Sequence, residues 1–261
     1  MSAELLREQE TIKKCAICGK PYEQKEYGAG GHTFKVWVAQ CECEEIERQR
    51  QEKIKQEQER IEKARKKAQE LKQNIHCPLT LEFYKNKNFD NLSDCNENVL
   101  FCQKYAQEFN KKTSTGIFML GNVGTGKTTL QACICNELEK RGVICLLTKF
   151  SALLDCFIES CSFESTIQTT KLFKTLTCFD YVVLDDLGRE KYTDKRLEFA
   201  FRIIDTLIES GAVVSITGNY ETIQKLETIA EYKAILDRIS DMCGHAMYFN
   251  GESYRGKKYK C

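Results

Sequence analysis

The sequence contains no long apolar run. None of its 261 residues belongs to a stretch of the roughly 18 consecutive apolar residues that a membrane-spanning helix needs. The first residues, MSAELLREQETIKK, lack the apolar core of a secretory signal peptide. The formal net charge of +1 gives no global attraction to nucleic acid or membrane, so any such surface has to be a local patch. These absences predict a soluble, cytoplasmic protein with no membrane partner.

Cysteine, in contrast, is abundant, with 15 residues. A secreted disulfide scaffold would be short and its cysteines evenly paired, whereas this chain is long and the count is odd. Thiols inside apolar helix and strand patterns behave as small hydrophobic groups. We therefore expect five cysteines to be reduced core residues, namely Cys133, Cys135, Cys145, Cys156 and Cys178.

Four other cysteines lie close together near the N-terminus, as the pairs Cys15–Cys18 and Cys41–Cys43. Two close pairs separated by about 22 residues suit tetrahedral zinc, although the second pair is Cys-x-Cys instead of Cys-x-x-Cys. His32 is the spare ligand candidate, and unrelated surface cysteines are the alternative. Four thiolates would close the coordination shell, so the predicted zinc is structural and stabilises a segment with few apolar residues.

The pattern changes twice along the chain. Residues 1–45 are expected to form the zinc-binding module. Residues 46–75 contain no glycine or proline and are dominated by good helix formers, which predicts a long, solvated helical arm. From residue 76 to 261, apolar strand-like runs alternate with helical patterns, which predicts a mostly parallel sheet covered by helices on both faces. The expected strands are 116–120, 143–147, 181–184, 212–217 and 245–249.

The segment FMLGNVGTGKTTL fits the phosphate-loop template G-x-x-x-x-G-K-[ST]. An apolar strand precedes it and an amphipathic helix follows it, as the template requires. Lys127 is expected to reach the β- and γ-phosphates, and the Thr128 hydroxyl to bind Mg²⁺. The residues expected to hold the nucleotide, ATP, are Gly121, Asn122, Val123, Gly124, Thr125, Gly126, Lys127, Thr128 and Thr129.

A second motif, FDYVVLDDLGRE, is acidic. It places two carboxylates after an apolar strand, at the strand end where α/β sheets bind ligands. Asp185 is expected to hold Mg²⁺, and Asp186 to orient the attacking water. Asp186 is one methylene shorter than the glutamate often found there, which favours slow hydrolysis. In VVSITGNY, Asn219 ends a strand and is a candidate sensor of the γ-phosphate, although asparagine is also a common turn residue.

The order FMLGNVGTGKT, YVVLDDLG, SITGN, ILDRI, ESYR resembles the AAA+ ATPases of the bacterial and phage helicase-loader group, the DnaC/DnaI type, and the related IstB transposition helpers. The resemblance covers about residues 80–261. It implies that Arg238 is an arginine finger reaching a neighbouring subunit's nucleotide, and that Arg255 is a second sensor. An ion pair of Arg238 with Asp237 or Asp241 is the alternative. The family also lacks a C-terminal lid, so we expect none after Arg255.

The resemblance implies a function in DNA replication, and missing motifs agree with it. The sequence has no N-K-x-D guanine reader, no DEAD/H box and no Arg-rich kinase lid. We therefore expect a slow ATPase, stimulated by assembly, that docks on a DnaB-type replicative helicase, binds single-stranded DNA and self-associates through its nucleotide interface. Lys149 with Phe150, Phe157 and Phe163 could contact DNA, or the aromatic rings could be core. An IstB-like transposition helper and a nucleotide-gated interaction protein with negligible turnover are the alternatives.

Overall fold

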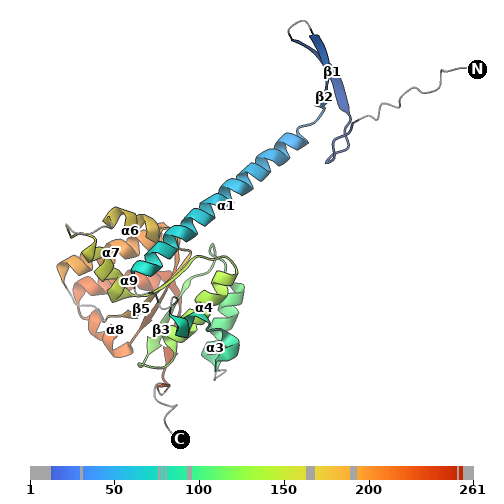
Figure 1. Cartoon of the computed structure of the whole chain (residues 1–261). Coiled ribbons are helices and arrows are strands. Elements are labelled where there is room, and N and C mark those ends of the chain that lie inside the picture. The colour runs from blue at the N-terminus through green and yellow to red at the C-terminus, as the bar shows by residue number, and fades with distance from the viewer. Residues whose placement is uncertain are drawn as a thin grey trace, which may run out of the picture. The chain divides into compact units, whose positions relative to one another are not determined.

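The computed structural model describes residues 13–29, 32–75, 77, 79, 81–92, 96–162, 168–188, 193–251 and 253–254. The chain divides into two compact units, Met1–Glu62 and Lys63–Cys261, and the boundary falls inside the long helix α1, Cys43–Asn74 (Figure 1). Each unit is described separately below. Among the described residues, no helix is both long and apolar enough to cross a membrane.

The first unit contains an antiparallel hairpin of β1 (Tyr22–Ala29) and β2 (His32–Ala39), which are joined in register from Tyr22 opposite Ala39 to Ala29 opposite His32. A tight turn precedes the hairpin. In it, the Gly19 amide donates to the Cys15 carbonyl at 2.9 Å, and Gly19 has a φ of 73°, which glycine adopts without steric cost.

Helix α1 runs unbroken for 32 residues, as its lack of glycine and proline predicts. The apolar residues of α1 divide into two groups. Ile46 and Ile54 are exposed, whereas Ala68 and Leu71, near the end of the helix, are buried in the core of the second unit. The last turns of α1 therefore belong to the packing of the second unit and are not solvated along their whole surface.

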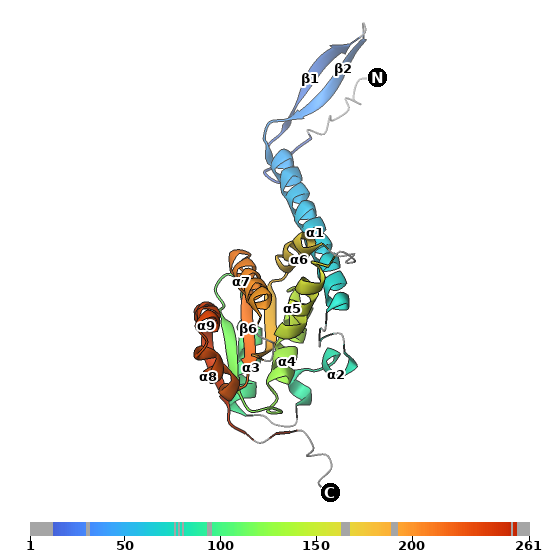
Figure 2. The same ribbon diagram turned by 90° about the vertical axis from the view of Figure 1, so that its left-hand side faces the viewer.

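The second unit is built on a five-stranded sheet in the order β4-β5-β6-β3-β7, in which every neighbouring pair is parallel (Figures 1 and 2). The expected strands are all present, with bounds shifted by up to three residues. The strands are β3 (Gly116–Gly121), β4 (Cys145–Lys149), β5 (Tyr181–Leu187), β6 (Val213–Gly218) and β7 (Cys243–Phe249).

Helices cover both faces of this sheet, as continuous apolar strands require. On one face, α3 and α4 pack together and α4 contacts β4 and β5. On the other face, α5, α7 and α9 contact the sheet, and α7 also contacts α5 and α9. The helices are α2 (Glu82–Lys85), the 3-10 turn Phe89–Asn91, α3 (Glu97–Glu108), α4 (Lys127–Lys140), α5 (Phe150–Glu159), α6 (Thr169–Leu176), α7 (Asp194–Glu209), α8 (Tyr220–Glu227) and α9 (Ala230–Met242).

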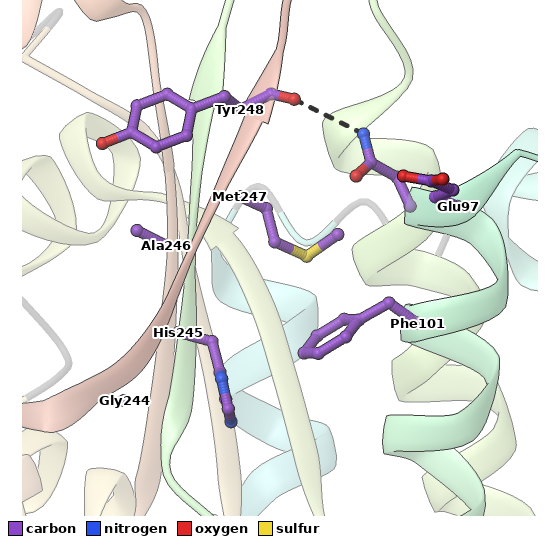
Figure 3. A pocket seen from close by; sticks show the side chains of 8 residues that line it. Glu97, Phe101, Gly244, His245, Ala246, Met247 and Tyr248 are labelled. Atoms are coloured by element: carbon purple, nitrogen blue, oxygen red, sulfur yellow. Dashed lines mark hydrogen bonds between the residues drawn. The ribbon is translucent and has the colours of Figure 1, made fainter.

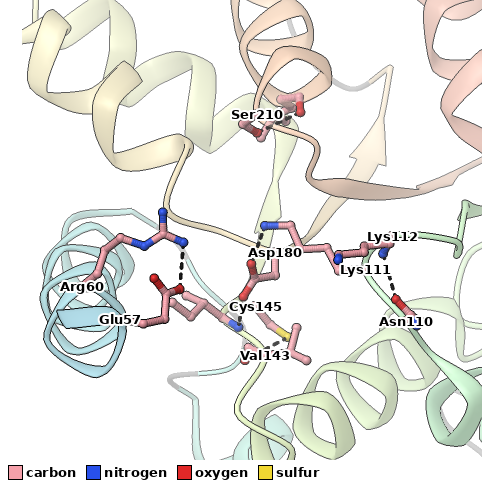
Figure 4. A network of polar contacts seen from close by, with 11 residues as sticks. Glu57, Arg60, Asn110, Lys111, Lys112, Val143, Cys145, Asp180 and Ser210 are labelled. Atoms are coloured by element: carbon pink, nitrogen blue, oxygen red, sulfur yellow. Dashed lines mark hydrogen bonds and ion pairs between the residues drawn. The ribbon is translucent and has the colours of Figure 1, made fainter. Parts of the chain in front are cut away.

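Asp180 ties together the amino ends of two strands (Figure 4). Its Oδ2 accepts a hydrogen bond from the Ile144 amide at 2.9 Å, and its Oδ1 pairs with the Lys111 ammonium at 2.6 Å. This polar cluster lies at the end of β4 and β5 opposite to their carboxyl ends. It therefore fixes the sheet while leaving the ligand-binding edge to other residues.

The 13 described cysteines form no disulfide. Cys133, Cys135, Cys145 and Cys156 are buried as expected, but Cys178 is only half-buried, because it lies in the turn after α6 and not inside an element. Burial raises the pKa of Cys133 to about 11. A raised thiol pKa keeps this group neutral, as suits a core position.

Candidate nucleotide and metal sites

The phosphate loop connects the end of β3 to the first turn of α4. Gly121, Gly124 and Gly126 all have positive φ, with Gly126 in the left-handed region at 91° as the residue before the helix. A Cβ at Gly121 would lie 2.3 Å from the carbonyl oxygen of Phe249 on β7. The loop backbone therefore requires glycine at two fixed template positions and also at Gly124, which the template leaves open.

Lys127 begins α4 and is almost fully buried, although it carries a charge. Its ammonium donates to the carbonyl oxygens of Gly121 at 2.8 Å and Asn122 at 2.7 Å. The side chain thus curls back over the loop that it follows. This position brings the positive charge to the concave side of the loop, where phosphate oxygens are bound in proteins with this motif.

Three residues from three different elements meet at the carboxyl edge of the sheet. Asp185 Oδ1 accepts hydrogen bonds from the Thr128 hydroxyl at 2.9 Å and from the Thr217 hydroxyl at 2.6 Å. Thr128 lies on α4, Asp185 on β5 and Thr217 on β6, so the fold assembles what the sequence separates. A hydroxyl beside a carboxylate is a donor set that suits Mg²⁺.

Asp185 is buried, with 3% of the residue's surface exposed, and the pKa of its carboxyl is raised above the ordinary value of 3.8. Burial is the main cause, and the neighbouring Asp186 adds to it, while the hydrogen bonds from Thr217 and Thr128 act in the opposite direction. A divalent cation would favour the charged form that burial disfavours. The electrostatics of the position therefore match those of a cation ligand.

Asp186 has a φ of +58° and is the one non-glycine residue with positive φ among the described residues. The pairing of β5 with β6 shifts register between Leu184 and Leu187, which places Asp186 in an irregular step of the strand. Its backbone amide donates to the Thr217 hydroxyl at 3.0 Å. Left-handed conformations at non-glycine residues occur often at functional sites, where surrounding contacts hold them.

Asn219 follows β6 and caps helix α8. Its side-chain oxygen accepts a hydrogen bond from the Glu221 amide at 3.0 Å, and the residue is half-buried. Strand β6 lies beside β5, as the sequence predicts, so Asn219 reaches the same sheet edge as the acidic pair. The oxygen of this amide is committed to the cap, which leaves the amide nitrogen as its group for a ligand.

Arg238 lies on α9 and pairs with Asp205 of α7 at 2.7 Å. The alternative expectation, an ion pair of Arg238 with Asp237 or Asp241, is wrong. Helix α9 packs against α7 and brings Asp205 within reach of the guanidinium. The guanidinium also lies over the Phe201 ring, 5.3 Å from its centroid. Both partners of the pair remain 44% exposed, so Arg238 stands at the surface.

Arg255 lies outside the described residues, but the residue before it does not. The Tyr254 amide donates to the Gly124 carbonyl at 2.9 Å, and a Cβ at Gly126 would lie 3.9 Å from the Tyr254 ring. The SYR motif therefore reaches the phosphate loop at Tyr254. Sequence reasoning missed Tyr254, since the motif was considered for its arginine alone.

The prediction that aromatic rings contact DNA is wrong for the two rings that the structure describes. Phe150 and Phe157 are fully buried, because α5 packs its apolar face on β4, β5 and α7. Phe163 lies outside the described residues. Lys149 ends β4 opposite Asp185 and is half-buried, so it faces the nucleotide edge of the sheet.

The segment Asn86–Asn91 is held against the phosphate-loop helix α4. Asn136 on α4 donates through its side-chain nitrogen to the carbonyls of Tyr84 and Lys87, both at 2.8 Å. Asn88 and Asn91 cap the short turn reciprocally. Asn136 was not identified from the sequence, where it is one polar residue of an amphipathic helix.

In the first unit, the four N-terminal cysteines converge. The Sγ atoms of Cys15, Cys18, Cys41 and Cys43 all lie within 4.8 Å of one another. Four thiolates bound at about 2.3 Å around a tetrahedral zinc would be roughly 3.8 Å apart, so the donors and their spacing fit such an ion. The pKa of the Cys18 thiol is lowered to about 7, by the Lys20 backbone amide and then by Cys41. The pKa values of Cys41 and Cys43 are raised, that of Cys43 chiefly by its contact with Cys18, so the case for a zinc site depends on the convergence of the four sulfur atoms.

His32 is placed at the far end of the hairpin from these cysteines. Its backbone pairs with Ala29, whereas the pair Tyr22–Ala39 lies next to the cysteines at the other end. Seven register steps at about 3.4 Å each separate the two ends by about 24 Å. The backbone therefore excludes His32 from the cysteine cluster, which answers the question left open by the sequence.

A cavity of about 490 Å³ lies along the outer edge of β7, under α3 (Figure 3). Phe101 on α3 faces His245 and Met247 there, and the Asn98 side chain donates to the Tyr248 carbonyl at 3.5 Å. None of the predicted nucleotide residues lines this cavity. The candidate nucleotide site lies instead at the phosphate loop and the acidic pair.

A phosphate loop on β3, an acidic pair on β5 and the intervening strand β6 define a P-loop ATP-binding protein of the AAA+ class. The chain belongs to the family of IstB-like ATP binding proteins, whose sequence pattern matches residues 44–261. It is also 29% identical over 167 residues to the replicative helicase loader DnaC of Escherichia coli K12 and, equally, of Shigella flexneri. That similarity covers 60% of this chain and 64% of those relatives, so the chain spans less than two thirds of their length.

Solved structures agree on the fold. The crystal structure of the DnaC helicase loader matches with a TM-score of 0.55 and 22% identity, covering 65% of this chain and all of that one. The crystal structure of DnaI matches with a TM-score of 0.55 and 21% identity, over 67% and 94% of the two chains. AMPPCP-bound DnaA from Aquifex aeolicus matches with a TM-score of 0.52 and 18% identity, over 62% and 50%. The AAA+ core predicted from the sequence is confirmed.

Proposed function

We propose that this protein is an ATP-dependent helicase loader that docks on a replicative, DnaB-type DNA helicase and helps to place it on single-stranded DNA during replication. ATP hydrolysis is the release switch. The observation that carries the proposal is the contact between Thr128 and Asp185 at the phosphate loop, in a chain 29% identical to replicative helicase loaders. This contact supports the nucleotide part of the function, and the relatives support its client.

The phosphate loop and Lys127 bind the nucleotide. The backbone amides of the loop and the amino end of α4 face the phosphates, with Lys127 exchanging the carbonyls of Gly121 and Asn122 for the β- and γ-phosphates. Thr128 and Asp185 would hold Mg²⁺, which would supply positive charge to stabilise the phosphates. The buried carboxylate gains a counter-charge in this state, so binding relieves the cost of its desolvation.

Hydrolysis requires that a water molecule be oriented toward the γ-phosphorus. Asp186 performs this step, and the amide nitrogen of Asn219 contacts the γ-phosphate or the same water. The short side chain of Asp186 favours slow turnover, as suits a switch. Arg255, next to the loop-bound Tyr254, is the second sensor.

Assembly completes the site through Arg238. We assign to Arg238 the part of an arginine finger, which donates fixed positive charge to the nucleotide of a neighbouring copy. Its present pair with Asp205 is exposed, and exposed pairs contribute only about 0–1 kcal/mol, so releasing the guanidinium costs little. Fingers of this kind are worth about 10³–10⁵ in rate in GTPases, which makes turnover depend on self-association.

The first unit is the docking part. The four clustered cysteines hold a structural zinc ion that stabilises residues 1–45, and the helical arm of residues 46–75 connects them to the ATPase domain of residues 76–261. This module and arm hold the helicase, and the ATPase domain engages single-stranded DNA.

The proposal is tested by size-exclusion chromatography of the protein with ATP·Mg²⁺, single-stranded DNA and the cognate replicative helicase, alone and combined. We expect a complex with the helicase at micromolar concentrations that dissociates on hydrolysis. Absence of any complex in the presence of ATP would remove the helicase from the proposal. Phosphate release is followed in parallel, so that the ATPase part is judged separately.

A second candidate function comes from the family match itself, which is to IstB-like ATP binding proteins. In this alternative the protein is a transposition helper that binds duplex DNA and a transposase. It predicts ATP-dependent filaments on duplex DNA and protection of duplex in footprinting. The loader proposal predicts a preference for single-stranded DNA, so a competition between the two forms of DNA separates the functions.

A further inference from the structure

Thr217 is a buried threonine on β6 that touches both members of the acidic pair. Its hydroxyl donates to Asp185 Oδ1 at 2.6 Å and accepts from the backbone amide of Asp186 at 3.0 Å. A hydroxyl has one proton and two lone pairs, and an ionised carboxylate can only accept. The direction of both hydrogen bonds is therefore fixed, and a single oxygen atom joins the two acidic residues.

We propose that Thr217 is the positioning residue that fixes the Mg²⁺-binding carboxylate of Asp185 and the water-orienting residue Asp186 relative to each other. The inference rests on the proposed ATPase function and assigns a part of its machinery to a residue outside the recognised motifs. Thr217 does not touch the substrate; it acts through the two acidic residues.

The strand geometry explains why a side chain is needed here. The β5–β6 pairing skips from Leu184 to Leu187, so the regular ladder is interrupted where Asp186 lies, at a φ of +58°. The Thr217 hydroxyl accepts the hydrogen bond of the Asp186 amide, which a backbone carbonyl of the neighbouring strand would accept in a regular ladder. Without it, a largely buried N–H would lose its bond, and the left-handed turn at Asp186 would lose a contact that holds it.

The same hydroxyl also restricts rotation of the Asp185 carboxylate. Thr128 and Thr217 approach the same oxygen, Oδ1, from α4 and β6. Other polar residues nearby have other partners: Ser215 on β6 bonds the Ile117 amide and the Tyr181 hydroxyl, and Asn219, which follows β6, caps α8. Among these three polar residues, Thr217 is the one whose hydroxyl bonds the acidic pair.

The test compares Thr217→Val, Thr217→Ala and Thr217→Ser in the full chain. Valine keeps the shape of threonine and removes both hydrogen bonds, alanine removes them with less volume, and serine keeps the hydroxyl. Thr175→Val is the matched control, because Thr175 is also buried but bonds a carbonyl of its own helix, Lys171, at 2.8 Å. Thermal unfolding of each variant confirms that the fold is retained.

ATP affinity is measured with and without Mg²⁺, and turnover as kcat and KM separately. Partners that orient metal ligands are typically worth 10- to 100-fold in metal affinity or activity. We expect Thr217→Val and Thr217→Ala to raise the Mg²⁺ concentration for half-maximal ATP affinity about tenfold and to lower kcat by about 10- to 100-fold. ATP affinity without Mg²⁺ should stay within about twofold, and Thr217→Ser should recover most of both losses.

Unchanged Mg²⁺ dependence and kcat in both Thr217→Val and Thr217→Ala would overturn the inference. So would equal losses in Thr175→Val, since they would report general destabilisation. If the parent protein binds ATP·Mg²⁺ without turnover, the hydrolysis part of the proposed function fails. The Mg²⁺ dependence of ATP affinity still tests Thr217 in that case, so the two failures are distinguishable.

Discussion

The Thr128 hydroxyl and the Asp185 carboxylate lie 2.9 Å apart although 57 residues separate them in the chain. Thr128 lies in the first turn of the phosphate-loop helix, and Asp185 lies near the carboxyl end of β5, across the intervening strand β6. The sheet thus brings a hydroxyl donor and a buried carboxylate to one point. That point is the site from which the following predictions are derived.

Replacing Lys127 by alanine should weaken ATP binding by about 10- to 100-fold, because a charged hydrogen bond is worth about 1.5–3 kcal/mol. Titration with a fluorescent ATP analogue measures this effect. Lys140→Ala, at the end of the same helix and paired with Glu137 at the surface, is the control and should bind normally. Wild-type affinity in Lys127→Ala would remove the phosphate loop from the proposed function.

Replacing Asp186 by asparagine should leave ATP binding within about threefold and lower phosphate release by about 100-fold or more, since general-base steps contribute about 10²–10⁴. Asp186→Gly should lose turnover as well but raise the free energy of unfolding by up to about 1 kcal/mol, because glycine adopts a φ of +58° without strain. Chemical denaturation checks the second effect. Undiminished phosphate release in Asp186→Asn would favour a nucleotide-gated interaction protein with negligible turnover.

Replacing Arg238 by alanine should hardly change ATP affinity or stability, since its pair with Asp205 is exposed. Turnover that depends on protein concentration or on a partner should fall by about 10³-fold. Asp205→Asn is the matched variant: it frees the guanidinium and should keep or increase assembled turnover. Equal turnover of Arg238→Ala and the parent across a concentration series would contradict the finger assignment.

The purified protein should contain about one zinc ion per chain, measured by metal analysis, and Cys15→Ser or Cys41→Ser should lose it. Hydrogen exchange should then show loss of protection in β1 and β2, because the small module has little core of its own. Cys161→Ser, an exposed cysteine outside the cluster, should retain zinc. Full zinc content in both cluster variants would exclude the four-cysteine site.

Glu139→Gln should destabilise the second unit by about 1 kcal/mol at pH 7, a value reduced for solvent screening because the Glu139 side chain is 36% exposed. Burial by itself lowers the pKa of Lys72, and the Glu139 carboxylate at 2.5 Å more than offsets this, so the pKa lies above 10.5.

The sign of the pH dependence follows from that balance. In the parent, the stabilisation from Lys72 is complete below pH 10.5 and is lost as the pH rises through the folded pKa. In Glu139→Gln burial dominates, so Lys72 can lose its proton at lower pH. The difference in unfolding free energy between the parent and Glu139→Gln should therefore become smaller from about pH 7 to pH 10. Glu137→Gln, whose partner Lys140 is exposed, should show no such trend.

Much of the fold and part of the candidate site could be predicted from the sequence because they depend on local patterns. The phosphate loop, the strand before Asp185 and the glycine-free helix are each defined by consecutive residues. Thr217 could have been suspected, since it lies in SITGN near the end of a strand beside the acidic pair. Its hydrogen bonds to the Asp185 carboxylate and to the Asp186 backbone amide depend on the register shift between β5 and β6, which no sequence pattern indicated.

The sequence by itself determined the elements, the phosphate loop and the acidic pair, because helix and strand periodicity and loop glycines act over a few residues. Only the tertiary structure decided which partners meet: Arg238 with Asp205, the four cysteines with one another, and His32 at the opposite end of its hairpin. It also decided that the rings of Phe150 and Phe157 are core. These outcomes depend on packing and register between segments far apart in the chain, which local physical preferences do not specify.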